Sequence, residues 1–586
     1  MTLKEFEVLR CIAENGNVTQ RVISDETEYS LGTVNSTVSA LRKKGYIGEG
    51  GSLTSEGRRI LEPYRVDNAI ILAAGMSTRF VPFSYEKPKG LMSVKGEVLI
   101  ERQIRQLQEA GVKEIVLVLG HMMEKFLYLT EKYGVKVVLN NEYRYKNTHS
   151  SIYFSREYLK GSYICCADNY FTKNVFHTYE FHSLYSTLYM EGTWRGERGV
   201  TTDKSGLIVA TQRPAVDQWV MNGYAYFSRS FSEAFRPILE DTYGKPETEH
   251  LYWEQIYAEH VSELPLYEKR YTDDIVLEFD SVAELEKFDP DYIKYNDLSM
   301  TRNICKVLDC TPSQIKGIKP VAKGLTNKSF SFVCKDKKYI YRNPGSVSGE
   351  YIDRKNEKRA LETACRLGID SSYIYADENE GWKISEFIDV TEEFNFGEER
   401  HLELLCELQR RLYENPMTCG KEFDYLKEAK VFLEKLAVID PESRCIALEY
   451  LAQIEKIDAE IKRDGWPIQL IHNDIYEDNL LVSGDKLYLI DWEYAGDSDI
   501  GFDLCKLFLK NGAVGRDIDK YLAIYYRRMP TAAEKKHIVG CAAVSFFYWY
   551  IWALYMVKKG NDYLNYMYSY FNNMKTYTEE YKMIKE

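Results

Sequence analysis

The 586-residue sequence lacks several short motifs that would assign it to a class of protein. No G-x-x-x-x-G-K-[ST] segment occurs, which excludes a P-loop kinase. The twelve cysteines include no C-x₂-C pair, so neither a zinc-binding motif nor a disulfide framework is supported. Reduced and mostly buried thiols are the simplest interpretation, and we expect a cytoplasmic protein.

The chain also lacks an excess of positive charge. The chain holds 76 Lys and Arg against 89 Asp and Glu, a formal net charge of −13. This balance argues against a nucleic-acid-binding surface spread over the whole protein, so any DNA contact would be local. The N-terminal segment MTLKEFEVLR contains acidic residues and no apolar run, and we expect no signal peptide.

Long uncharged segments are absent apart from residues 538–557, which read IVGCAAVSFFYWYIWALYMV. Twenty apolar residues are long enough to span a bilayer. However, this segment contains three Tyr, two Trp and one Ser, and it lies late in the chain with no second such segment. We therefore predict a buried helix of a large domain and no membrane span.

A chain of this length cannot form a single core, and three domains are expected. We predict boundaries at residues 1–66, 67–297 and 298–586. Residues 1–66 have three short helical patterns, then a glycine-rich turn and LTSEGRRIL. This order resembles a winged helix-turn-helix of the MarR type, with 30–45 in the recognition-helix position. The segment holds nine Lys and Arg against nine Asp and Glu, which disfavours DNA binding and favours a docking or dimerising role.

The second domain begins with AIILAAGMSTRFVPFSYEKPKG at residues 69–90. An apolar run ends in Leu72, Ala73, Ala74 and Gly75, whose small side chains let backbone N–H groups approach a ligand. Two cations follow, Arg79 and Lys89. A buried strand that ends in such a loop is typical of a phosphate-binding site, although a strand and loop with ordinary surface charges is the alternative.

Alternating strand and helix patterns then predict a parallel α/β sheet. The apolar run at 162–166 ends at Asp168. Ligands of open α/β sheets bind at the carboxyl ends of strands, so Asp168 is expected in the same crevice as the 73–75 loop. There it would hold Mg²⁺, which prefers oxygen ligands. A helix N-cap is the alternative role.

Several segments of this domain resemble LicC-type CTP:phosphocholine cytidylyltransferases, within the sugar-nucleotide pyrophosphorylase fold. They are LAAGMSTRF…EKPKGL (72–91), NNEYRYKNTHSSIYFSREYL (140–159), ADNY (167–170), NGYAYF (222–227), LYWEQIY (251–257) and LEFDSVAEL (277–285). The resemblance implies that Arg79 and Lys89 hold the triphosphate of CTP and that Asp168 and Asp280 bind the metal. The sequence departs from the family pattern at Ser77, where a glycine is common in the family.

Aromatic residues are frequent in the second half of this domain. An aromatic cage is suited to a trimethylammonium group, which cannot donate a hydrogen bond, at about 2 kcal/mol per desolvated contact. Core packing is the alternative for each ring. The candidates are Trp194, Trp219, Tyr224, Tyr226, Tyr252 and Trp253.

The third domain contains the most specific motif, IHNDIYEDN at 471–479, followed by an apolar run and Asp491. Its H-x-D-x₄-N spacing matches the catalytic loop of protein kinases. We predict that Asp474 accepts the proton of the attacking hydroxyl and that Asn479 and Asp491 bind Mg²⁺.

Residues 298–586 resemble the LicA-like choline kinases, on the protein-kinase-like fold. The segment 323–345 resembles the hairpin over the nucleotide, and its matching residues Thr326 and Asn327 are expected to contact ATP. Arg342 takes the place of the usual lysine, with Glu357 as its ion-pair partner. Trp492, Trp549 and Trp552 are candidates for a second choline cage, with core packing again the alternative.

The two resemblances together imply a bifunctional enzyme that phosphorylates choline with ATP and then forms CDP-choline from CTP and phosphocholine. One alternative is the same pair of reactions on ethanolamine or another amino alcohol. Another is a transcription regulator whose enzyme-like domains only sense ligands, although the complete set of Asp474, Asn479 and Asp491 argues against inactive domains. The sequence does not determine the oligomeric state.

Overall fold

The computed structural model describes residues 1–321, 328–344 and 352–585. The chain divides into two compact units, residues 1–315 and 316–586, which are described separately. All twelve cysteines are free, as expected from the absence of paired motifs.

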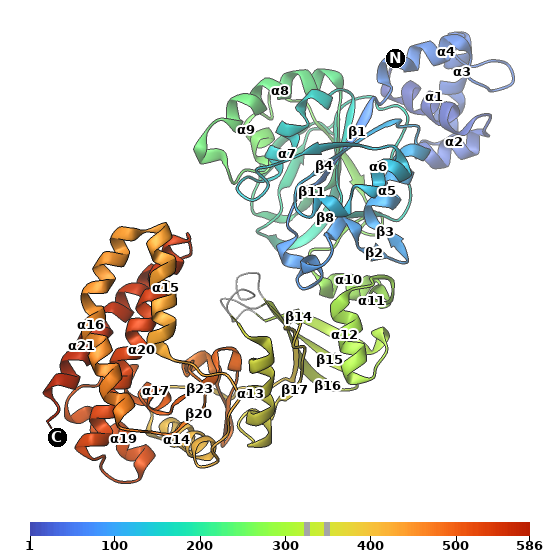
Figure 1. Cartoon of the computed structure of the whole chain (residues 1–586). Coiled ribbons are helices and arrows are strands. Elements are labelled where there is room, and N and C mark those ends of the chain that lie inside the picture. The colour runs from blue at the N-terminus through green and yellow to red at the C-terminus, as the bar shows by residue number, and fades with distance from the viewer. Residues whose placement is uncertain (322–327, 345–351, 586) are drawn as a thin grey trace. The chain divides into compact units, whose positions relative to one another are not determined.

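Unit 1 starts with the predicted winged helix (Figure 1). Its helices are α1 (Leu3–Asn15), α2 (Gln20–Thr27), α3 (Leu31–Lys43) and α4 (Ser55–Leu61). Side chains of Thr2, Thr19, Ser30 and Thr54 accept backbone N–H groups at the four N-termini, which explains where the helices begin. A single bridge between Ile47 and Leu53 forms the wing.

The winged helix is packed against the rest of unit 1. Glu14 of α1 accepts hydrogen bonds from the Thr178 backbone N–H at 2.7 Å and contacts His177 Nδ1 at 3.0 Å. Phe6 packs against Phe181, with ring centroids 5.2 Å apart, and Tyr179 belongs to the same buried cluster. The winged helix therefore packs as part of unit 1 and is not a separate domain joined by a linker.

The predicted α/β sheet forms the centre of unit 1 (Figure 1). Strand order is β10-β9-β11-β6-β1-β4-β5, and β8 pairs with β11 and β12. β1 lies parallel to both β4 and β6, with Ile71 opposite Leu117 and Cys165. The strands are β1 (Asn68–Ala73), β4 (Glu114–Leu119), β5 (Lys136–Leu139), β6 (Ser162–Cys166), β8 (Leu184–Trp194), β9 (Gly199–Thr202), β10 (Ile208–Gln212), β11 (Ala215–Phe227) and β12 (Tyr267–Tyr271).

Helices cover both faces of this sheet. Ile71 and Leu117 face a core shared with α5 and α6, whereas Ile70 and Val116 face α7, α8 and α9. This arrangement explains why all six residues of β1 are buried, as the continuous apolar run predicted. The helices are α5 (Leu99–Glu109), α6 (Tyr128–Tyr133), α7 (Thr148–Phe154), α8 (Arg229–Tyr243) and α9 (Trp253–Glu259).

Shorter elements complete unit 1. A small hairpin pairs β2 (Ser93–Val94) with β3 (Glu97–Val98), and a separate two-stranded sheet pairs β7 (Asn169–Phe171) with β13 (Val276–Glu278), which are far apart in the chain. Three helices then lead out of the domain, α10 (Val282–Phe288), α11 (Tyr292–Tyr295) and α12 (Ser299–Leu308).

Unit 2 has the two-part layout expected of a protein-kinase-like fold. A five-stranded sheet of order β14-β15-β16-β18-β17 is followed by a mainly helical part. Its strands are β14 (Ile315–Pro320, beginning at the last residue of unit 1), β15 (Lys328–Cys334), β16 (Lys337–Asn343), β17 (Tyr373–Ala376) and β18 (Lys383–Glu386), and α13 (Arg354–Arg366) lies between β16 and β17 in sequence.

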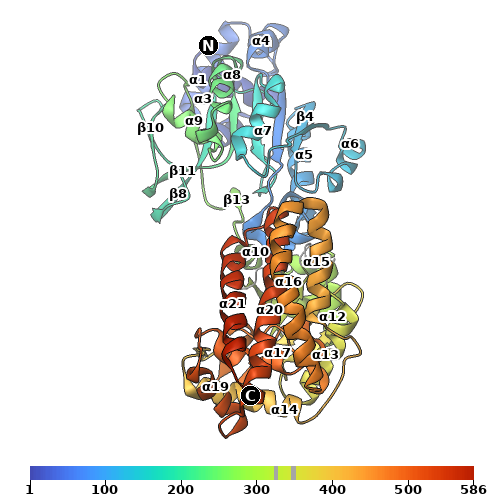
Figure 2. The same cartoon turned by 60° about the vertical axis from the view of Figure 1, so that its left-hand side comes forward.

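The helical part holds the catalytic-loop hairpins and a group of long helices that lie side by side in Figure 2. The small strands are β19 (Glu392–Glu393), β20 (Ile468–Ile471), β21 (Leu480–Ser483), β22 (Lys486–Leu489) and β23 (Gly496–Asp499). The helices are α14 (Glu399–Tyr413), α15 (Tyr425–Ile439), α16 (Pro441–Arg463), α17 (Gly501–Leu504), α18 (Lys506–Leu509), α19 (Arg516–Tyr526), α20 (Ala532–Lys558) and α21 (Leu564–Met583).

Helix α20 contains the long uncharged segment. It is long and apolar enough to cross a membrane, but 94% of its most apolar window is buried inside the structure. It packs against α15, α16 and α21. The prediction of a buried core helix is therefore confirmed.

Candidate active sites

The loop after β1 lines a cavity of about 420 Å³ at the carboxyl end of the parallel strands. Leu72, Ala73, Ala74 and Gly75 all border it, as does Lys89. A side chain on Gly75 would meet no atom within 4 Å, so there is open space over the loop for a ligand. Ser77 has φ = 51°, a left-handed conformation that glycine adopts more easily, which is consistent with the departure noted at this position.

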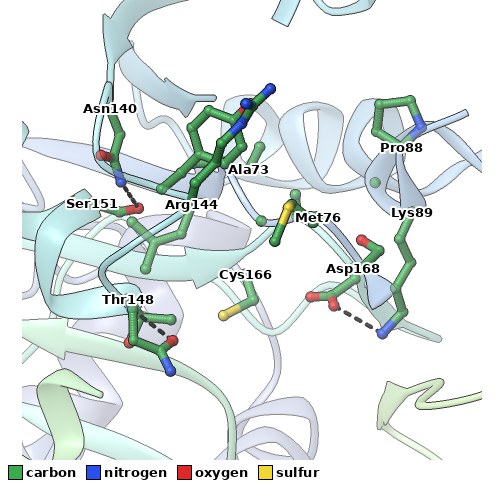
Figure 3. Close-up of a pocket in the computed structure, with 18 of the residues that line it drawn as sticks. Ala73, Met76, Pro88, Lys89, Asn140, Arg144, Thr148, Ser151, Cys166 and Asp168 are labelled. Atoms are coloured by element: carbon green, nitrogen blue, oxygen red, sulfur yellow. Dashed lines mark hydrogen bonds and ion pairs between the residues drawn. The ribbon is translucent and has the colours of Figure 1, made fainter. Parts of the chain in front are cut away.

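Lys89 and Asp168 face each other at one end of this cavity, 2.8 Å apart between Nζ and Oδ2 (Figure 3). Gly90 makes this pairing feasible, because a Cβ there would lie 2.9 Å from the Cβ of Ala167. Lys89 is buried, and although burial alone would lower its pKa, the charges of Asp168 and Glu278 raise it. The ammonium therefore stays charged beside the cavity.

The other end of the cavity is polar. Asn140, Thr148 and Ser151 lie there in Figure 3, and the Asn140 amide donates to Ser151 Oγ at 3.1 Å. Hydrogen-bonding side chains at the end away from Lys89 suit a ligand whose neutral polar part lies there and whose anionic part lies next to the ammonium.

Acidic residues gather beside Lys89. Antiparallel pairing of β13 with β7 sets Glu278 opposite Asn169, next to Asp168. Burial, together with the negative charges of Asp168 and Asp280, raises the pKa of Glu278 well above its ordinary value. Arg79 contacts Asp280 at 3.0 Å and does not line the cavity. Asp168, Glu278 and Asp280 offer carboxylate oxygens, the ligand type that Mg²⁺ prefers, so these residues fit a divalent cation.

Glu278 was not identified from sequence, although LEFD offered a signal. Residues two apart on a strand share a face, so Glu278 and Asp280 were candidates together.

The aromatic candidates in unit 1 do not gather at this cavity, and none of them lines it. Tyr224, Tyr226 and Trp253 are core residues with at most 3% exposure. The face of Trp219 is covered by the Arg270 guanidinium, 4.7 Å from the ring centroid. Trp194 and Tyr252 are the exposed members, at 45% and 41%. Burial argues against a cage role for Tyr224, Tyr226 and Trp253, for which core packing was the alternative.

Glu254 lies next to Trp253 and was also missed. Its Oε1 accepts from the Tyr185 hydroxyl at 3.0 Å, while the buried Oε2 has no hydrogen-bond partner among the residues that the structure describes. Burial raises the pKa of Glu254 to about 7. An unpaired carboxylate oxygen of this kind is a candidate contact for a cationic group.

The second site, in unit 2, is built on the loop between β20 and β21. Asp503 accepts the backbone N–H groups of His472 at 2.7 Å and Asn473 at 2.8 Å, which fixes the loop. The Asn479 amide donates to Asp474 Oδ2 at 3.1 Å. The loop therefore brings Asp474 and Asn479 into contact, as expected from their positions in the H-x-D-x₄-N motif.

The pKa values of Asp474, in the catalytic loop, and of Asp491, after β22, are shifted in opposite directions. Burial raises the pKa of Asp474 to about 7, and the negative charge of Asp491 acts in the same direction. Burial would also raise the pKa of Asp491, but Lys383 and Arg342 lower it to about 2. Pairs of carboxyl groups with divergent pKa values are typical of a division between proton transfer and charge stabilisation.

Arg342 lies at the centre of a buried ionic network. It contacts Glu357, the partner expected from sequence, as well as Asp491 at 2.6 Å and Glu493 at 3.2 Å. Lys383, which sequence reasoning missed, reaches Asp491 at 3.3 Å. Thr326 and Asn327 lie outside the described residues. The oxygens of Asp491 and Asn479 are the types that Mg²⁺ prefers, so both fit a metal ligand role.

Trp549 and Trp552 lie edge to face, with centroids 5.7 Å apart. Tyr494 and Tyr570 are next to Trp549, at 5.8 and 6.3 Å. Burial is the main cause that raises the pKa of both tyrosines, and the negative charge of Asp474 is a further cause. This aromatic group therefore lies near the catalytic loop. Tyr494 and Tyr570 were missed in a chain that contains 47 tyrosines.

Trp492 has a different environment. It is fully buried, its Nε1 donates to the Leu489 carbonyl at 2.9 Å, and its ring packs on His472. This placement argues against a cage role, because no ring face is open to a ligand.

Three regions of the chain match known protein families. They are winged helix-turn-helix DNA-binding over residues 1–47, MobA-like NTP transferase domain over 69–175, and choline/ethanolamine kinase over 318–541. These matches confirm the three predicted fold classes and their order.

Individual relatives cover the second and third regions. The choline-phosphate cytidylyltransferase of Streptococcus pneumoniae is 33% identical over 224 residues, 38% of this chain and 96% of the relative. The 2-aminoethylphosphonate cytidylyltransferase of Lancefieldella rimae is 36% identical over 230 residues, 39% of this chain and 93% of the relative. A crystal structure of choline kinase LicA from Streptococcus pneumoniae is 21% identical, covers 48% of this chain and 97% of its own, and has a TM-score of 0.40.

Proposed function

The chain belongs to the choline-phosphate cytidylyltransferase family, and on that premise we propose that it is a bifunctional enzyme that makes CDP-choline. Unit 2 transfers the γ-phosphoryl group of ATP to the hydroxyl of choline. Unit 1 then transfers CMP from CTP to phosphocholine and releases pyrophosphate. One observation carries the proposal: a chain with 33% identity to a cytidylyltransferase over nearly all of that relative also matches choline/ethanolamine kinase in its second unit.

In the kinase reaction, Asp474 accepts the proton of the choline hydroxyl as the oxygen attacks the γ-phosphorus. Its pKa of about 7 suits a base at neutral pH, and Asn479 orients its carboxylate. Asp491 stays ionised because Arg342 and Lys383 lie beside it. The aromatic group of Trp549, Trp552, Tyr494 and Tyr570, which lies near the catalytic loop, would receive the trimethylammonium group of choline.

In the cytidylyl transfer, a phosphocholine oxygen attacks the α-phosphorus of CTP. The bond to the bridging oxygen breaks, and pyrophosphate leaves with the electron pair. The backbone of the 73–77 loop and the Lys89 ammonium lie where negative charge builds on the triphosphate. Arg79, which pairs with Asp280 at 3.0 Å outside the cavity lining, would supply a second cation to the triphosphate.

Both sites suit Mg²⁺, which when bound would neutralise triphosphate charge and orient it for in-line attack. Asp168, Glu278 and Asp280 would hold it in unit 1, and Asn479 and Asp491 in unit 2. Burial is the main cause of the raised pKa of Glu278 and the charges of Asp168 and Asp280 add to it, so a bound cation would favour the ionised carboxylate.

The proposal is tested by product analysis. The full chain is incubated with deuterium-labelled choline, ATP, CTP and Mg²⁺, and labelled phosphocholine and CDP-choline are identified by mass. Omitting CTP should stop the reaction at phosphocholine. Failure to form CDP-choline from supplied phosphocholine and CTP would refute the second activity, and failure to consume choline with ATP would refute the first.

Ethanolamine and other amino alcohols are the alternative substrates. A primary ammonium is best met by a carboxylate, whereas a trimethylammonium group is best met by aromatic faces. Steady-state rates on choline and ethanolamine, measured separately for each reaction, decide between them. Selection of CTP rests on the family relationship.

DNA binding is a second function favoured by the match of residues 1–47 to a DNA-binding family. Helix α3 has no acidic residue and ends with Arg42 and Lys43 exposed. Retention of a labelled promoter fragment by the full chain, abolished by Arg42→Ala together with Lys43→Ala, would support it. We place the enzyme in the cytoplasm, with its two soluble substrates and both nucleotides.

A further inference from the structure

The segment that joins the two units packs on the loop that carries Lys89. Residues 289–308 include α11 and α12, belong to unit 1, and lie outside both the transferase match at 69–175 and the kinase match at 318–541. Leu298, Met300 and Ile304 of this segment are buried. This buried face shows that the segment packs on unit 1 and does more than connect the two units in sequence.

Glu86 makes the closest connection. One carboxylate oxygen accepts the Ser299 N–H at 2.6 Å and the other accepts the Met300 N–H at 3.0 Å. These are the first two N–H groups of α12, which have no partner inside the helix. Leu298, at the N-cap, has no side-chain acceptor, so Glu86 provides the cap from 213 residues away in sequence. A carboxylate is also favoured there by the helix dipole.

Two further contacts fix the other end of the same loop. Asn296, fully buried, accepts the Ser93 N–H at 2.8 Å and donates to the Ser93 carbonyl at 2.8 Å. Asp289 accepts the Lys95 N–H at 2.6 Å. The stretch from Glu86 to Lys95 is therefore held at both ends by the joining segment, with Lys89 between the anchors.

We propose that α12 and the residues before it are a positioning element of the cytidylyltransferase site, acting through Glu86. The element holds the 86–95 loop so that the Lys89 ammonium stays against Asp168, 2.8 Å away, and next to the triphosphate. Glu86 touches no substrate in this scheme, so it is a positioning residue. The inference rests on the proposed cytidylyl transfer and adds that the joining segment belongs to its active site.

The test uses three single variants of the full chain and one double variant, Glu86→Ala with Ser299→Pro. Glu86→Ala removes the cap. Ser299→Pro removes one N–H donor and should leave the helix intact, because proline is accepted at the first helical position and Leu298 already has extended backbone angles. Glu131→Ala, an exposed glutamate on α6, is the matched control.

Glu86→Ala should lower kcat for CDP-choline formation by about 10- to 100-fold, since small displacements of a charged group cost rates of this order. KM for phosphocholine should change less than kcat. Choline phosphorylation in the same samples should match the wild type, as should both activities of Glu131→Ala. Ser299→Pro should lower kcat less, and its effect should vanish in the double variant, because both changes break one interaction.

Hydrogen exchange gives a readout that does not depend on turnover. Amides of residues 87–95 should exchange faster in Glu86→Ala than in the wild type or in Glu131→Ala. Unchanged kcat with unchanged exchange, or an equal loss of both activities, would overturn the inference. Absence of CDP-choline formation by the wild type would instead refute the proposed function, and the exchange result would still decide whether Glu86 anchors the loop.

Discussion

Lys383 lies directly opposite Arg342 in the antiparallel register of β16 and β18, and both side chains reach Asp491. Two cationic side chains therefore contact Asp491, whereas protein kinases have one lysine on the strand that corresponds to β16. Because Arg342 is also bound to Glu357 and Glu493, Lys383 is the less constrained cation of the pair. It is the better placed of the two to contact a phosphate.

Replacing Lys383 tests this difference. Lys383→Met keeps an unbranched side chain without the charge and should lower kcat of choline phosphorylation by about 100-fold, the usual cost of losing one electrostatic contact to a developing charge. Steady-state kinetics with ATP and choline measure the effect. CDP-choline formation from supplied phosphocholine is the internal control and should be unaffected. A kinase rate within twofold of wild type would contradict the role.

Separate inactivation of the two sites should be achievable with single substitutions. Asp474→Asn should reduce phosphocholine formation by about 1,000-fold, within the range for loss of a general base, and should leave CDP-choline formation from phosphocholine intact. Asp168→Ala should do the reverse, because it removes the partner of Lys89 and one candidate metal ligand. Mass analysis of both products checks the pair. Loss of both activities in either variant would contradict two independent sites.

The aromatic group in unit 2 predicts a discrimination between substrates. Trp549→Leu should raise KM for choline by about 30-fold, equivalent to one desolvated cation–π contact of about 2 kcal/mol. The effect on ethanolamine should be smaller, since a primary ammonium relies on hydrogen bonds. Trp382→Leu is a control at a buried tryptophan of the sheet, packed on Tyr341 and Tyr375. Equal increases in KM for the two amines would contradict a cage at Trp549.

Much of this arrangement could be predicted from sequence because the relevant residues are close together in the chain. The β1 strand, its small-residue loop and Lys89 fall within 22 residues, 68–89, and Asp474 and Asn479 belong to one loop. Local spacing is sufficient for such groups, since the strand or turn that positions them is itself local. The buried character of α20 was predictable for the same reason.

Two of the residues that sequence reasoning missed reach the two sites through the pairing of strands that are distant in the chain. Lys383 reaches Asp491 because β18 pairs with β16, and Glu278 lies opposite Asn169, the neighbour of Asp168, because β13 pairs with β7. Neither pairing can be read from one sequence. The aromatic candidates show the opposite problem. Trp253 and Trp492 are residue types that form cation-binding cages, yet both side chains are buried. Composition does not reveal which side of a ring is open.

His537 predicts how the stability of unit 2 depends on pH. Its Nδ1 lies 2.7 Å from Asp464 Oδ2, its Nε2 lies 3.0 Å from Asp499 Oδ2, and its ring stacks on Trp466. Burial alone would lower the pKa of His537, but the hydrogen bonds and charges of Asp499 and Asp464 raise it above the ordinary value of 6.5. The protonated ring therefore ties α20 to β23 and to the end of α16.

A raised histidine pKa contributes stability that is fully present below pH 6.5 and is lost as pH rises through the folded-state value. His537→Gln removes the charge, and at low pH it should lower the free energy of unfolding by about 2 kcal/mol, the usual contribution of hydrogen bonds to a charged group. Urea unfolding of the full chain between about pH 6 and pH 9 should show this difference shrinking as pH rises. His260→Gln, which alters a surface pair with Glu263, should show no such trend. A difference between wild type and His537→Gln that is constant across the pH range would mean that the histidine is neutral in the folded protein, because only a protonated ring links its stabilising effect to pH.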